Sequence, residues 1–490
     1  MPIHPSSDLI QSTRRGYPGI LLILAIFIFS LLGGCSPAAP AADLAQPVAL
    51  ATQTGAPLTQ ASNEAEDIQI IAQTLVEQMA NGDFEAATSH FDATMRKALP
   101  ESKFKEIWQQ LTAQVGAYEK QLDTKQDELQ GYRRVHVISQ FEKANLDVLV
   151  VFDSQGQIAG LFFNPAEASG ATPQSYQAPD YVDRSTFVET EVTIGEGTWA
   201  LPGTLTLPRG EGPFPALVLV HGSGPNDQDE TIGPNKPFHD LAWGLASQGI
   251  AVLRYDKRTL THADQFTPEI QAKLTVQDET IADALLAAQL LRQTEKVAAQ
   301  RIFVAGHSLG GMLIPRIGQQ DPSLAGLVAL AGPTRPLEDL ILDQVTYLSN
   351  MDGVLTDQEA GELATIQAQV ARVKDPNLSK DTLATDLPLG IPPTYWLDLR
   401  GYQPAEVAKT LAQPLLILQG GRDYQVQAAK DYKGWKDSLA GQAEVTFHLY
   451  PDLNHLFIAG EGPSTPAEYQ NEGHVSPAVI ADIAAWIKDH

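Results

Sequence analysis

The chain is poor in cysteine and in positive charge. Its 490 residues include one cysteine, Cys35, which excludes an internal disulfide and leaves too few thiolates for a cysteine-based metal site. Lysine and arginine number 33 against 59 aspartates and glutamates, which gives a net charge of -26. Such a chain has little with which to neutralise a phosphate backbone, so nucleic acid is not an expected partner. The negative charge favours solubility and does not specify a function.

Signatures of cofactor chemistry are also missing. The sequence contains no HExxH, no phosphate-binding loop and no dinucleotide fingerprint. We therefore expect no metal and no organic cofactor. The composition, 43% hydrophobic and 19% charged, is that of a globular protein, and the length allows two or three domains. The sequence gives no oligomeric state.

An apolar run near the N-terminus is shorter than a bilayer requires. Arg14 and Arg15 precede ILLILAIFIFSLL (20–32), whereas a membrane span needs about 20 apolar residues. This pattern predicts a secretion signal over residues 1–35. Its ending, LGGC, resembles a bacterial lipobox, which implies cleavage before Cys35 and lipid attachment to its sulfur. The resemblance predicts an exported protein anchored to the membrane outside the cytoplasm; an uncleaved signal anchor is the alternative.

The next two segments differ in composition. Residues 36–66 are rich in Ala, Pro, Gln and Thr without a sustained period, which predicts a flexible linker. Residues 67–165 predict helices followed by strands, typical of a small α+β domain with helices packed on an antiparallel sheet. The predicted elements are helices from residue 67 to 81, at 84–95 and at 101–115, and strands at 132–141, 146–153 and 158–163. Its lone histidines, His90 and His136, are expected to be structural or surface residues.

Strands and helices alternate after a second linker at 166–182. Residues 183–490 therefore predict an α/β domain with a mostly parallel eight-stranded sheet and helices on both faces. The rhythm breaks at about 335–411, where helical and Pro-rich segments predict an inserted lid. In such sheets, binding and catalytic sites form at the carboxyl ends of the strands.

Ser308 follows the apolar strand pattern IFVA (302–305) within Gly306–Gly310, GHSLG. This matches G-x-S-x-G, which places a serine hydroxyl on a sharp turn between strand and helix. A serine nucleophile needs a base, and the base needs an acid to orient it. The alternative is a glycine-rich strand end in which the serine only satisfies the turn.

Asp423 and His455 are the predicted partners of Ser308. Asp423 follows the strand pattern PLLILQGG, and His455 follows the last strand pattern, EVTFHLY. The chain order Ser, Asp, His is the one expected for this fold. Other acids and histidines fit less well, namely Asp398, Asp452, His448 and His474.

The oxyanion of such a reaction needs two backbone N–H donors. One is expected from Leu309, directly after the serine, and the other from the loop after an earlier strand. The strand pattern PALVLV is followed by HGSGP, so Ser223 or Gly224 is expected to supply the second donor. The alternative is that His221 and Gly222 merely form a turn at the strand end.

From about Phe187 onward the chain resembles the α/β-hydrolase family, particularly secreted bacterial carboxylesterases with a small cystatin-like or nuclear-transport-factor-like domain in front. The resemblance is carried by HGSGPNDQDETIGPNKPF (221–238), LRYDKR (253–258), GHSLGG (306–311), QGGRDYQV (419–426) and LNH (453–455). It implies a nucleophile at Ser308, an acid at Asp423 and a base at His455. Gln228 and Thr259 depart from the pattern of that branch, which has Arg and Gly there.

The resemblance predicts hydrolysis of small-molecule carboxylic esters with short to medium acyl chains. A peptidase, amidase or thioesterase using the same residues, and a lipid-anchored binding module without turnover, are the alternatives. Tyr395, Trp396 and Tyr402 are candidates to line an acyl or alcohol pocket, or else to pack a helical cap. Arg258 is a candidate substrate contact, with a structural ion pair in LRYDKR as the alternative.

Overall fold

The computed structural model describes residues 59–490 except 130, 131, 154, 167–175 and 352. Cys35, the predicted signal and most of the predicted linker lie outside the described residues. The described chain falls into two compact units, and the boundary between them lies between Tyr176 and Gln177, inside the segment 166–182. Each unit is considered by itself.

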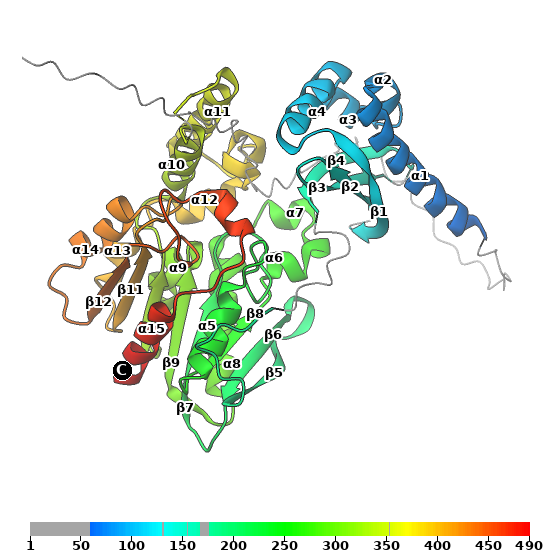
Figure 1. The fold of residues 1–490 in the computed structure, drawn as a ribbon. Helices are drawn as coiled ribbons and strands as arrows, with labels where there is room; N and C mark the ends of the chain where they lie inside the picture. The colour runs from blue at the N-terminus through cyan, green and yellow to red at the C-terminus, as the bar shows by residue number, and fades with distance from the viewer. Residues whose placement is uncertain (1–58, 130–131, 154, 167–175, 352) are drawn as a thin grey trace, which may run out of the picture. The chain divides into compact units, whose positions relative to one another are not determined.

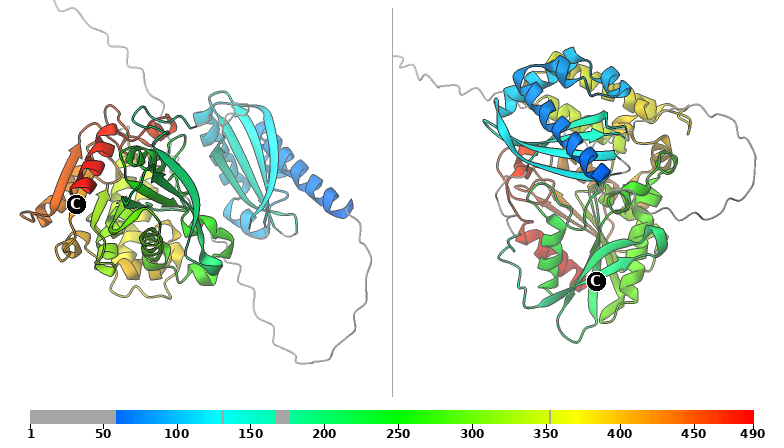
Figure 2. Two further views of the ribbon diagram at one scale, coloured as in Figure 1. Left: turned by 90° about the horizontal axis from the view of Figure 1, so that it is seen from below. Right: turned by 90° about the vertical axis from the view of Figure 1, so that its right-hand side faces the viewer.

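The first unit is a four-stranded antiparallel sheet with helices packed on it (Figure 2). The strands form a meander in the order β1-β2-β3-β4, so each strand pairs with its neighbour in sequence. Its elements are α1 (Thr59–Asn81), α2 (Phe84–Ala87), α3 (Ala93–Ala98), α4 (Glu101–Val115), β1 (Tyr118–Leu129), β2 (Tyr132–Phe141), β3 (Asn145–Phe152) and β4 (Ile158–Pro165).

The core of the first unit follows from the apolar periodicity of its elements. Ile68, Leu75 and Met79 lie on one face of α1 and are buried against the sheet, as helical spacing requires. In β2 and β3 alternate residues are buried, the pattern of strands with one covered face. This confirms the predicted arrangement of helices on an antiparallel sheet.

Two details of the first unit differ from the prediction. The helix expected at 84–95 is broken into α2 and α3, because Phe91 leaves the helix to bridge to Ile158 and Asp92 caps α3 through Met95 N at 2.6 Å. Strand β1 was not predicted, because its sequence, YEKQLDTKQDEL, is polar and largely exposed and so lacks apolar alternation. Helix α1 begins at Thr59, before the expected start of the domain.

The second unit contains an eight-stranded sheet in the order β12-β11-β10-β9-β7-β8-β6-β5 (Figure 1). The six strands from β7 to β12 are parallel to one another. At one side of the sheet, β6 pairs antiparallel with β8, and β5 pairs antiparallel with β6. The strands are β5 (Phe187–Ile194), β6 (Leu201–Pro208), β7 (Phe214–Val220), β8 (Ala251–Tyr255), β9 (Val297–His307), β10 (Gly326–Leu330), β11 (Leu415–Gly420) and β12 (Val445–Tyr450). The mostly parallel sheet confirms the predicted fold class.

Helices cover both faces of this sheet, because the central strands bury both of their faces. In β9, Ile302 and Val304 pack with α8 (Ala282–Arg292) and α9 (Leu309–Gln320). Phe303 points to the opposite face, where its ring centroid lies 5.7 Å from that of Trp486 in α15 (Pro477–Asp489). The remaining helices of the sheet region are α5 (Pro237–Ala246), α6 (Arg258–Thr261), α7 (Pro268–Gln271), a π-helical turn η3 (Gln277–Ile281), a second one η6 (Ala428–Tyr432), and α14 (Lys433–Ser438).

The predicted insertion between β10 and β11 is helical. It contains α10 (Leu337–Ser349), α11 (Asp357–Lys374), α12 (Pro393–Leu399) and α13 (Pro404–Ala408), with the short turns η4 (Ala384–Asp386) and η5 (Pro388–Gly390). We call this segment, 335–411, the cap. The other short 3-10 turns are η1 (Gly197–Trp199), η2 (Ala263–Gln265) and η7 (Pro466–Gln470).

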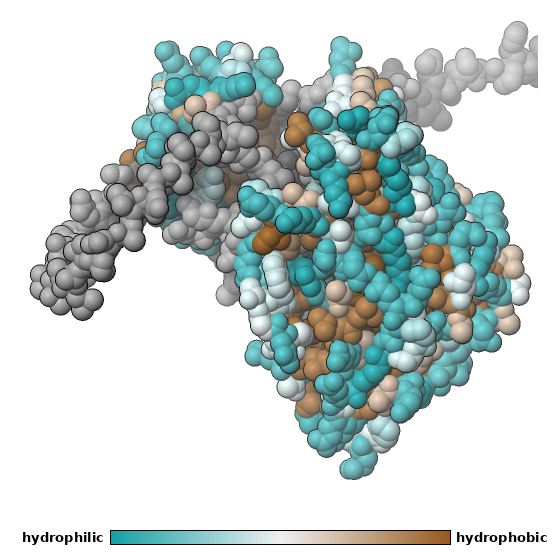
Figure 3. All heavy atoms as spheres, turned by 180° about the vertical axis from the view of Figure 1, so that it is seen from behind, coloured by the Kyte–Doolittle hydropathy of each residue, from teal (hydrophilic) through white to brown (hydrophobic). Residues whose placement is uncertain are grey.

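On the face shown in Figure 3, hydrophilic side chains predominate and hydrophobic side chains form several groups between them. Single exposed apolar residues are normal for a folded protein and mark no site by themselves. Among the residues that the structure describes, no helix combines the length and the apolar character needed to cross a membrane.

Candidate active site

Ser308 lies on a tight turn between β9 and α9. Its backbone has φ 53° and ψ -115°, a conformation that side chains rarely adopt, and its amide donates to the Leu330 carbonyl at 2.9 Å. A Cβ on Gly310 would meet the carbonyl oxygens of Val220 and His221. The turn therefore needs glycine at this place, which is the physical reason for the last residue of G-x-S-x-G.

The loop after β7 packs directly against the nucleophile. A Cβ on Gly222 would lie 3.1 Å from the Ser308 Cβ, so the absence of a side chain at Gly222 lets the two residues pack closely. The Gly222 N–H is already donated to Glu230 Oε1 at 2.7 Å. The N–H groups that follow it, those of Ser223 and Gly224, and that of Leu309 at the first position of α9 form no hydrogen bond within the described part of the chain. They are the donors expected to hold an oxyanion.

Asp423 and His455 are brought together by the loops after β11 and β12. His455 Nδ1 lies 2.7 Å from Asp423 Oδ2, and both residues are buried. A Cβ on Gly420 would lie 2.6 Å from the Leu453 carbonyl oxygen, so the two loops touch closely at this point. With Nδ1–H donated to the carboxylate, Nε2 of His455 is the nitrogen available to take a proton.

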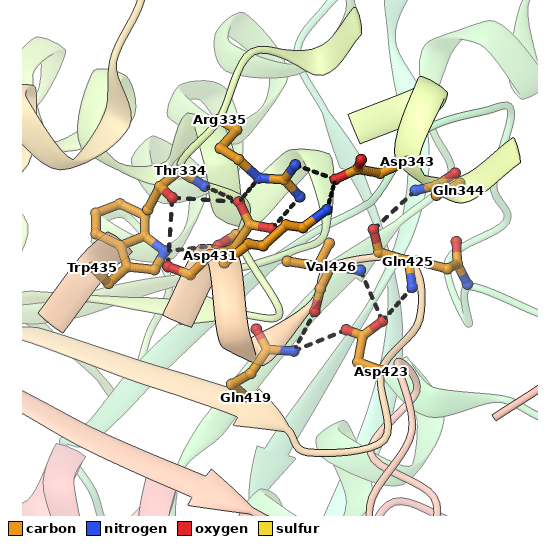
Figure 4. Close-up of polar contacts among 12 residues, drawn as sticks. Thr334, Arg335, Asp343, Gln344, Gln419, Asp423, Gln425, Val426, Asp431 and Trp435 are labelled. Atoms are coloured by element: carbon orange, nitrogen blue, oxygen red, sulfur yellow. Dashed lines mark hydrogen bonds and ion pairs between the residues drawn. The ribbon is translucent and has the colours of Figure 1, made fainter. Parts of the chain in front are cut away.

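The carboxylate of Asp423 is held by four donors. Its Oδ1 accepts from the backbone N–H groups of Gln425 and Val426 at 2.8 and 2.9 Å, and its Oδ2 accepts from Gln419 Nε2 at 2.9 Å (Figure 4). The fourth donor is His455 Nδ1, which also binds Oδ2. A buried carboxylate whose two oxygens accept from four donors is held in one orientation. The arrangement suits a group that orients a histidine and balances its charge.

The base loop is also joined to the nucleophile turn. His307, directly before Ser308, donates from Nε2 to the His455 carbonyl at 3.0 Å, and the two imidazole rings lie 4.6 Å apart. Ser308 is half-buried, and its hydroxyl forms no hydrogen bond among the described residues. Such contacts are often loose before a substrate binds. The three predicted triad residues therefore come from three neighbouring loops at one edge of the sheet.

Three candidate substrate contacts are engaged elsewhere. Tyr395 and Trp396 of α12 are 5% and 1% exposed, and their polar atoms bind Glu279 and the Ile391 carbonyl. Arg258 is bound by both carboxylate oxygens of the buried Asp283, at 2.6 and 2.8 Å. In this structure all three have packing or ion-pair roles. Tyr402 is likewise buried and donates to the Met312 carbonyl at 2.7 Å.

The less suitable acids and histidines have other partners or lie exposed. Asp398 pairs with Arg316, and Asp452 is exposed. His448 pairs with Asp482 and His474 with Asp240. The cations of LRYDKR also pair outside their own segment: Arg254 with Asp229 and Glu189, and Lys257 with Glu279.

A second buried network, centred on Asp431 in η6, follows the Asp423 loop in the chain and was not predicted. Asp431, fully buried, accepts from Thr334 N and from the Arg335 guanidinium, which also binds Asp343 of α10 (Figure 4). Gln344 of α10 donates to the Gln425 carbonyl at 3.2 Å. The first helix of the cap is thereby fixed to the loop that carries Asp423. A single aspartate followed by tyrosine gives no such signal in the sequence.

The sheet, the strained serine turn and the Asp–His pair after later strands together define the α/β-hydrolase fold. Residues 217–469 match the model of the family described as Alpha/beta hydrolase family, and residues 72–161 match a family described as Protein of unknown function (DUF3887). The chain belongs to the alpha/beta hydrolase family.

Esterase EstD of Thermotoga maritima is 40% identical to this chain over 420 residues, which are 84% of this chain and 93% of that protein. An esterase of Pyrococcus furiosus, known from its structure, is 16% identical with a TM-score of 0.39, over 62% of this chain and 91% of that one. An acylaminoacyl peptidase of Pyrococcus horikoshii is 16% identical with a TM-score of 0.36, over 69% of this chain and 46% of that one.

Proposed function

We propose that this hydrolase cleaves carboxylic esters through a Ser308–His455–Asp423 triad. The observation that carries the proposal is the 2.7 Å contact between His455 and Asp423 beside a serine turn of the expected kind. The 40% identity to a protein named an esterase, over most of both chains, supports the ester as the substrate class.

The proposed reaction proceeds through an acyl-enzyme. His455 Nε2 takes the proton as Ser308 Oγ attacks the ester carbonyl carbon, and Asp423 stabilises the imidazolium. The oxyanion receives N–H donors from Leu309 and from Ser223 or Gly224. His455 then protonates the departing alcohol. Water, activated by the same histidine, attacks the acyl group, releases the acid and returns the serine.

The substrates that we propose are small esters with short to medium acyl chains. A cavity beside the site, about 10 Å³ in volume, is lined by Glu230, His307 and apolar side chains. That volume holds roughly one water molecule, so it is no acyl pocket.

Labelling by a fluorophosphonate probe tests the nucleophile. We expect wild type to be labelled and Ser308→Ala to remain unlabelled while unfolding at the wild-type temperature. An unlabelled wild type would overturn the proposal and favour a binding module without turnover.

A panel of p-nitrophenyl esters of rising chain length, beside aminoacyl anilides and a thioester, tests the leaving group. We expect ester hydrolysis to be fastest, with a maximum at short to medium acyl chains. Fast anilide cleavage with inert esters would instead favour a peptidase or amidase.

We further propose that the protein is exported and anchored by lipid at Cys35. The support is the sequence alone, namely a short apolar run ending in LGGC. In cells, wild type should label with a fatty-acid analogue and sediment with membranes, whereas Cys35→Ala should do neither. A wild-type protein without label in the soluble fraction would contradict the anchor.

A further inference from the structure

Gly222, which packs against the nucleophile, is held from both sides by buried charged side chains. Its N–H donates to Glu230 Oε1 at 2.7 Å, and its carbonyl accepts from Lys257 Nζ at 2.8 Å. Glu230 and Lys257 are each only 2% exposed. Two opposite charges thus fix the His221–Gly222 peptide and the Gly222–Ser223 peptide, and the N–H of the second is one of the expected oxyanion donors.

The Glu230 carboxylate connects this loop to the other two loops of the site. Its Oε2 lies 2.9 Å from Nδ1 of His307, the residue before the nucleophile, and His307 donates on to the His455 carbonyl. Burial disfavours the charge on His307, but the facing Glu230 outweighs it, so that the His307 pKa is raised; the Glu230 pKa is lowered by the same pairing against its own burial. Both pKa shifts favour the ionic form of the pair.

Lys257 connects the same loop to the cap. Its ammonium lies 3.2 Å from Glu279 Oε1 in the π-helical turn η3, and Glu279 Oε2 accepts from the Tyr395 hydroxyl of α12 at 2.6 Å. Each buried cation thus faces a buried anion. An unpaired charge at this depth would be strongly unfavourable, so the two ion pairs hold a single arrangement.

An oxyanion hole works because its N–H groups are fixed before the charge develops. Ser223 and Gly224 have no side-chain support for their own N–H groups in the described structure, and Gly224 has open space where a Cβ would be. Their position depends on Gly222, immediately before them. Asn226 Nδ2 donates to the Ser223 and Gly224 carbonyls at 3.1 and 3.3 Å. The Glu230 and Lys257 contacts fix the residue from which this part of the loop begins.

We propose that Glu230 and Lys257 are positioning residues for hydrolysis, which hold the Gly222 peptides so that the following N–H groups meet the oxyanion. The inference rests on the proposed serine-hydrolase function. Neither residue touches the substrate. Both act through the backbone of the loop, and Glu230 additionally couples that loop to the nucleophile and base loops through His307.

Two matched pairs of variants test the proposal in the full chain. Glu230→Gln keeps an acceptor for the Gly222 N–H, whereas Glu230→Ala removes it. Lys257→Gln keeps a donor for the Gly222 carbonyl, whereas Lys257→Met removes it. Asp321→Asn is the control, because it breaks the Arg292–Asp321 ion pair at the end of α9 farthest from Ser308.

Kinetics of p-nitrophenyl ester hydrolysis and the rate of fluorophosphonate labelling are measured at a temperature where every variant is folded. We expect Glu230→Ala and Lys257→Met to lower kcat about 10- to 100-fold with KM changed less than about threefold, since the loss falls on the transition state. The Gln variants should recover most of that loss, and the control should keep the wild-type kcat. If a variant of Glu230 does not fold, the Lys257 pair still tests the proposal, and the Glu230 pair does so if a variant of Lys257 does not fold.

Wild-type kcat in both truncated variants, or Gln variants as slow as the truncated ones, would overturn the positioning role. That result is distinct from failure of the proposed function, in which wild type itself is neither labelled nor active.

Discussion

The hydroxyl of Tyr395 donates to the carboxylate of Glu279 at 2.6 Å, although the two residues lie in different helices and far apart in the chain. Both are buried, and burial together with the facing carboxylate raises the Tyr395 pKa, so the phenol stays protonated as the donor. The contact ties α12 of the cap to the turn that faces Lys257. Of the two roles that the sequence allowed for Tyr395, a pocket wall or packing of a helical cap, this contact favours the second.

Replacing Tyr395 by phenylalanine should lower the free energy of unfolding by about 1–3 kcal/mol, because a buried carboxylate loses a donor. The acyl-chain preference should stay as in wild type, since the ring remains and the hydroxyl faces Glu279. Chemical denaturation and the ester panel check both expectations. A shifted chain-length optimum with unchanged stability would instead restore Tyr395 to the pocket.

Asp423→Asn should lower kcat by about 10³- to 10⁴-fold, since an amide can present the wrong hydrogen-bonding group to His455 Nδ1. The expected change in KM is small. Stopped assays with a p-nitrophenyl ester give both constants. A variant within tenfold of wild type would show that another acid serves His455.

Gln419→Leu tests the support of that acid separately. The substitution removes the 2.9 Å donor to Asp423 and leaves the two backbone donors in place. We expect kcat to fall about 10- to 100-fold, which corresponds to about 1.5–3 kcal/mol for one hydrogen bond to a charged group. An effect as large as that of Asp423→Asn would mean that Gln419 does more than orient the acid.

The parts of the site that the sequence predicts are those with a local signal. Ser308 lies within a turn whose glycines are demanded by contacts such as those of Gly310, so the motif and the geometry have one cause. Asp423 and His455 follow strands whose apolar runs are plain to see. Parallel strands bring their carboxyl ends to the same end of the sheet. The sequence therefore predicted that Asp423 and His455 lie near Ser308, although it could not give the distance between them.

The parts that escaped prediction depend on pairing between distant segments. Glu230 and Lys257 stand among other charged residues, and nothing local distinguishes a charge that is buried from one that is solvated. For Tyr395 and Trp396 the sequence left two readings open, a pocket wall and a packed cap, because aromatic character indicates burial but not what the ring will face. Strand β1 was missed because it carries polar side chains on both faces.

Acid should destabilise the second unit between about pH 6.5 and pH 4. Burial lowers the pKa of His221, and likewise that of His239, to about 4. In the unfolded chain each histidine regains a pKa near 6.5, so below that pH the unfolded state binds protons that the native state does not. Each histidine then costs on the order of 3 kcal/mol by pH 4 and nothing above pH 6.5. Urea midpoints across this range measure the slope.

His239→Gln isolates one of the two contributions. The variant should lose less stability than wild type between pH 6.5 and pH 4.5, whatever its stability at pH 7.5. Equal slopes in the two proteins would mean that His239 takes up its proton in the native state as readily as in the unfolded chain.

Two glycines of the second unit should respond to alanine in opposite directions. Gly361 lies inside α11 with open space around it, so Gly361→Ala should raise the free energy of unfolding by about 0.5–1 kcal/mol through its helix propensity. Gly310 packs against the end of β7, where a methyl group would lie 2.7 Å from the His221 carbonyl oxygen and closer still to that of Val220.

Gly310→Ala must therefore push the nucleophile turn away from the oxyanion loop. Backbone atoms on both sides cannot yield as a flexible side chain would, so we expect a loss of more than about 3 kcal/mol or of folding altogether. If the variant folds, fluorophosphonate labelling should be far slower than in Gly361→Ala, because Ser308 moves with the turn. Labelling at the wild-type rate in Gly310→Ala would mean that Ser308 does not depend on this contact for its position.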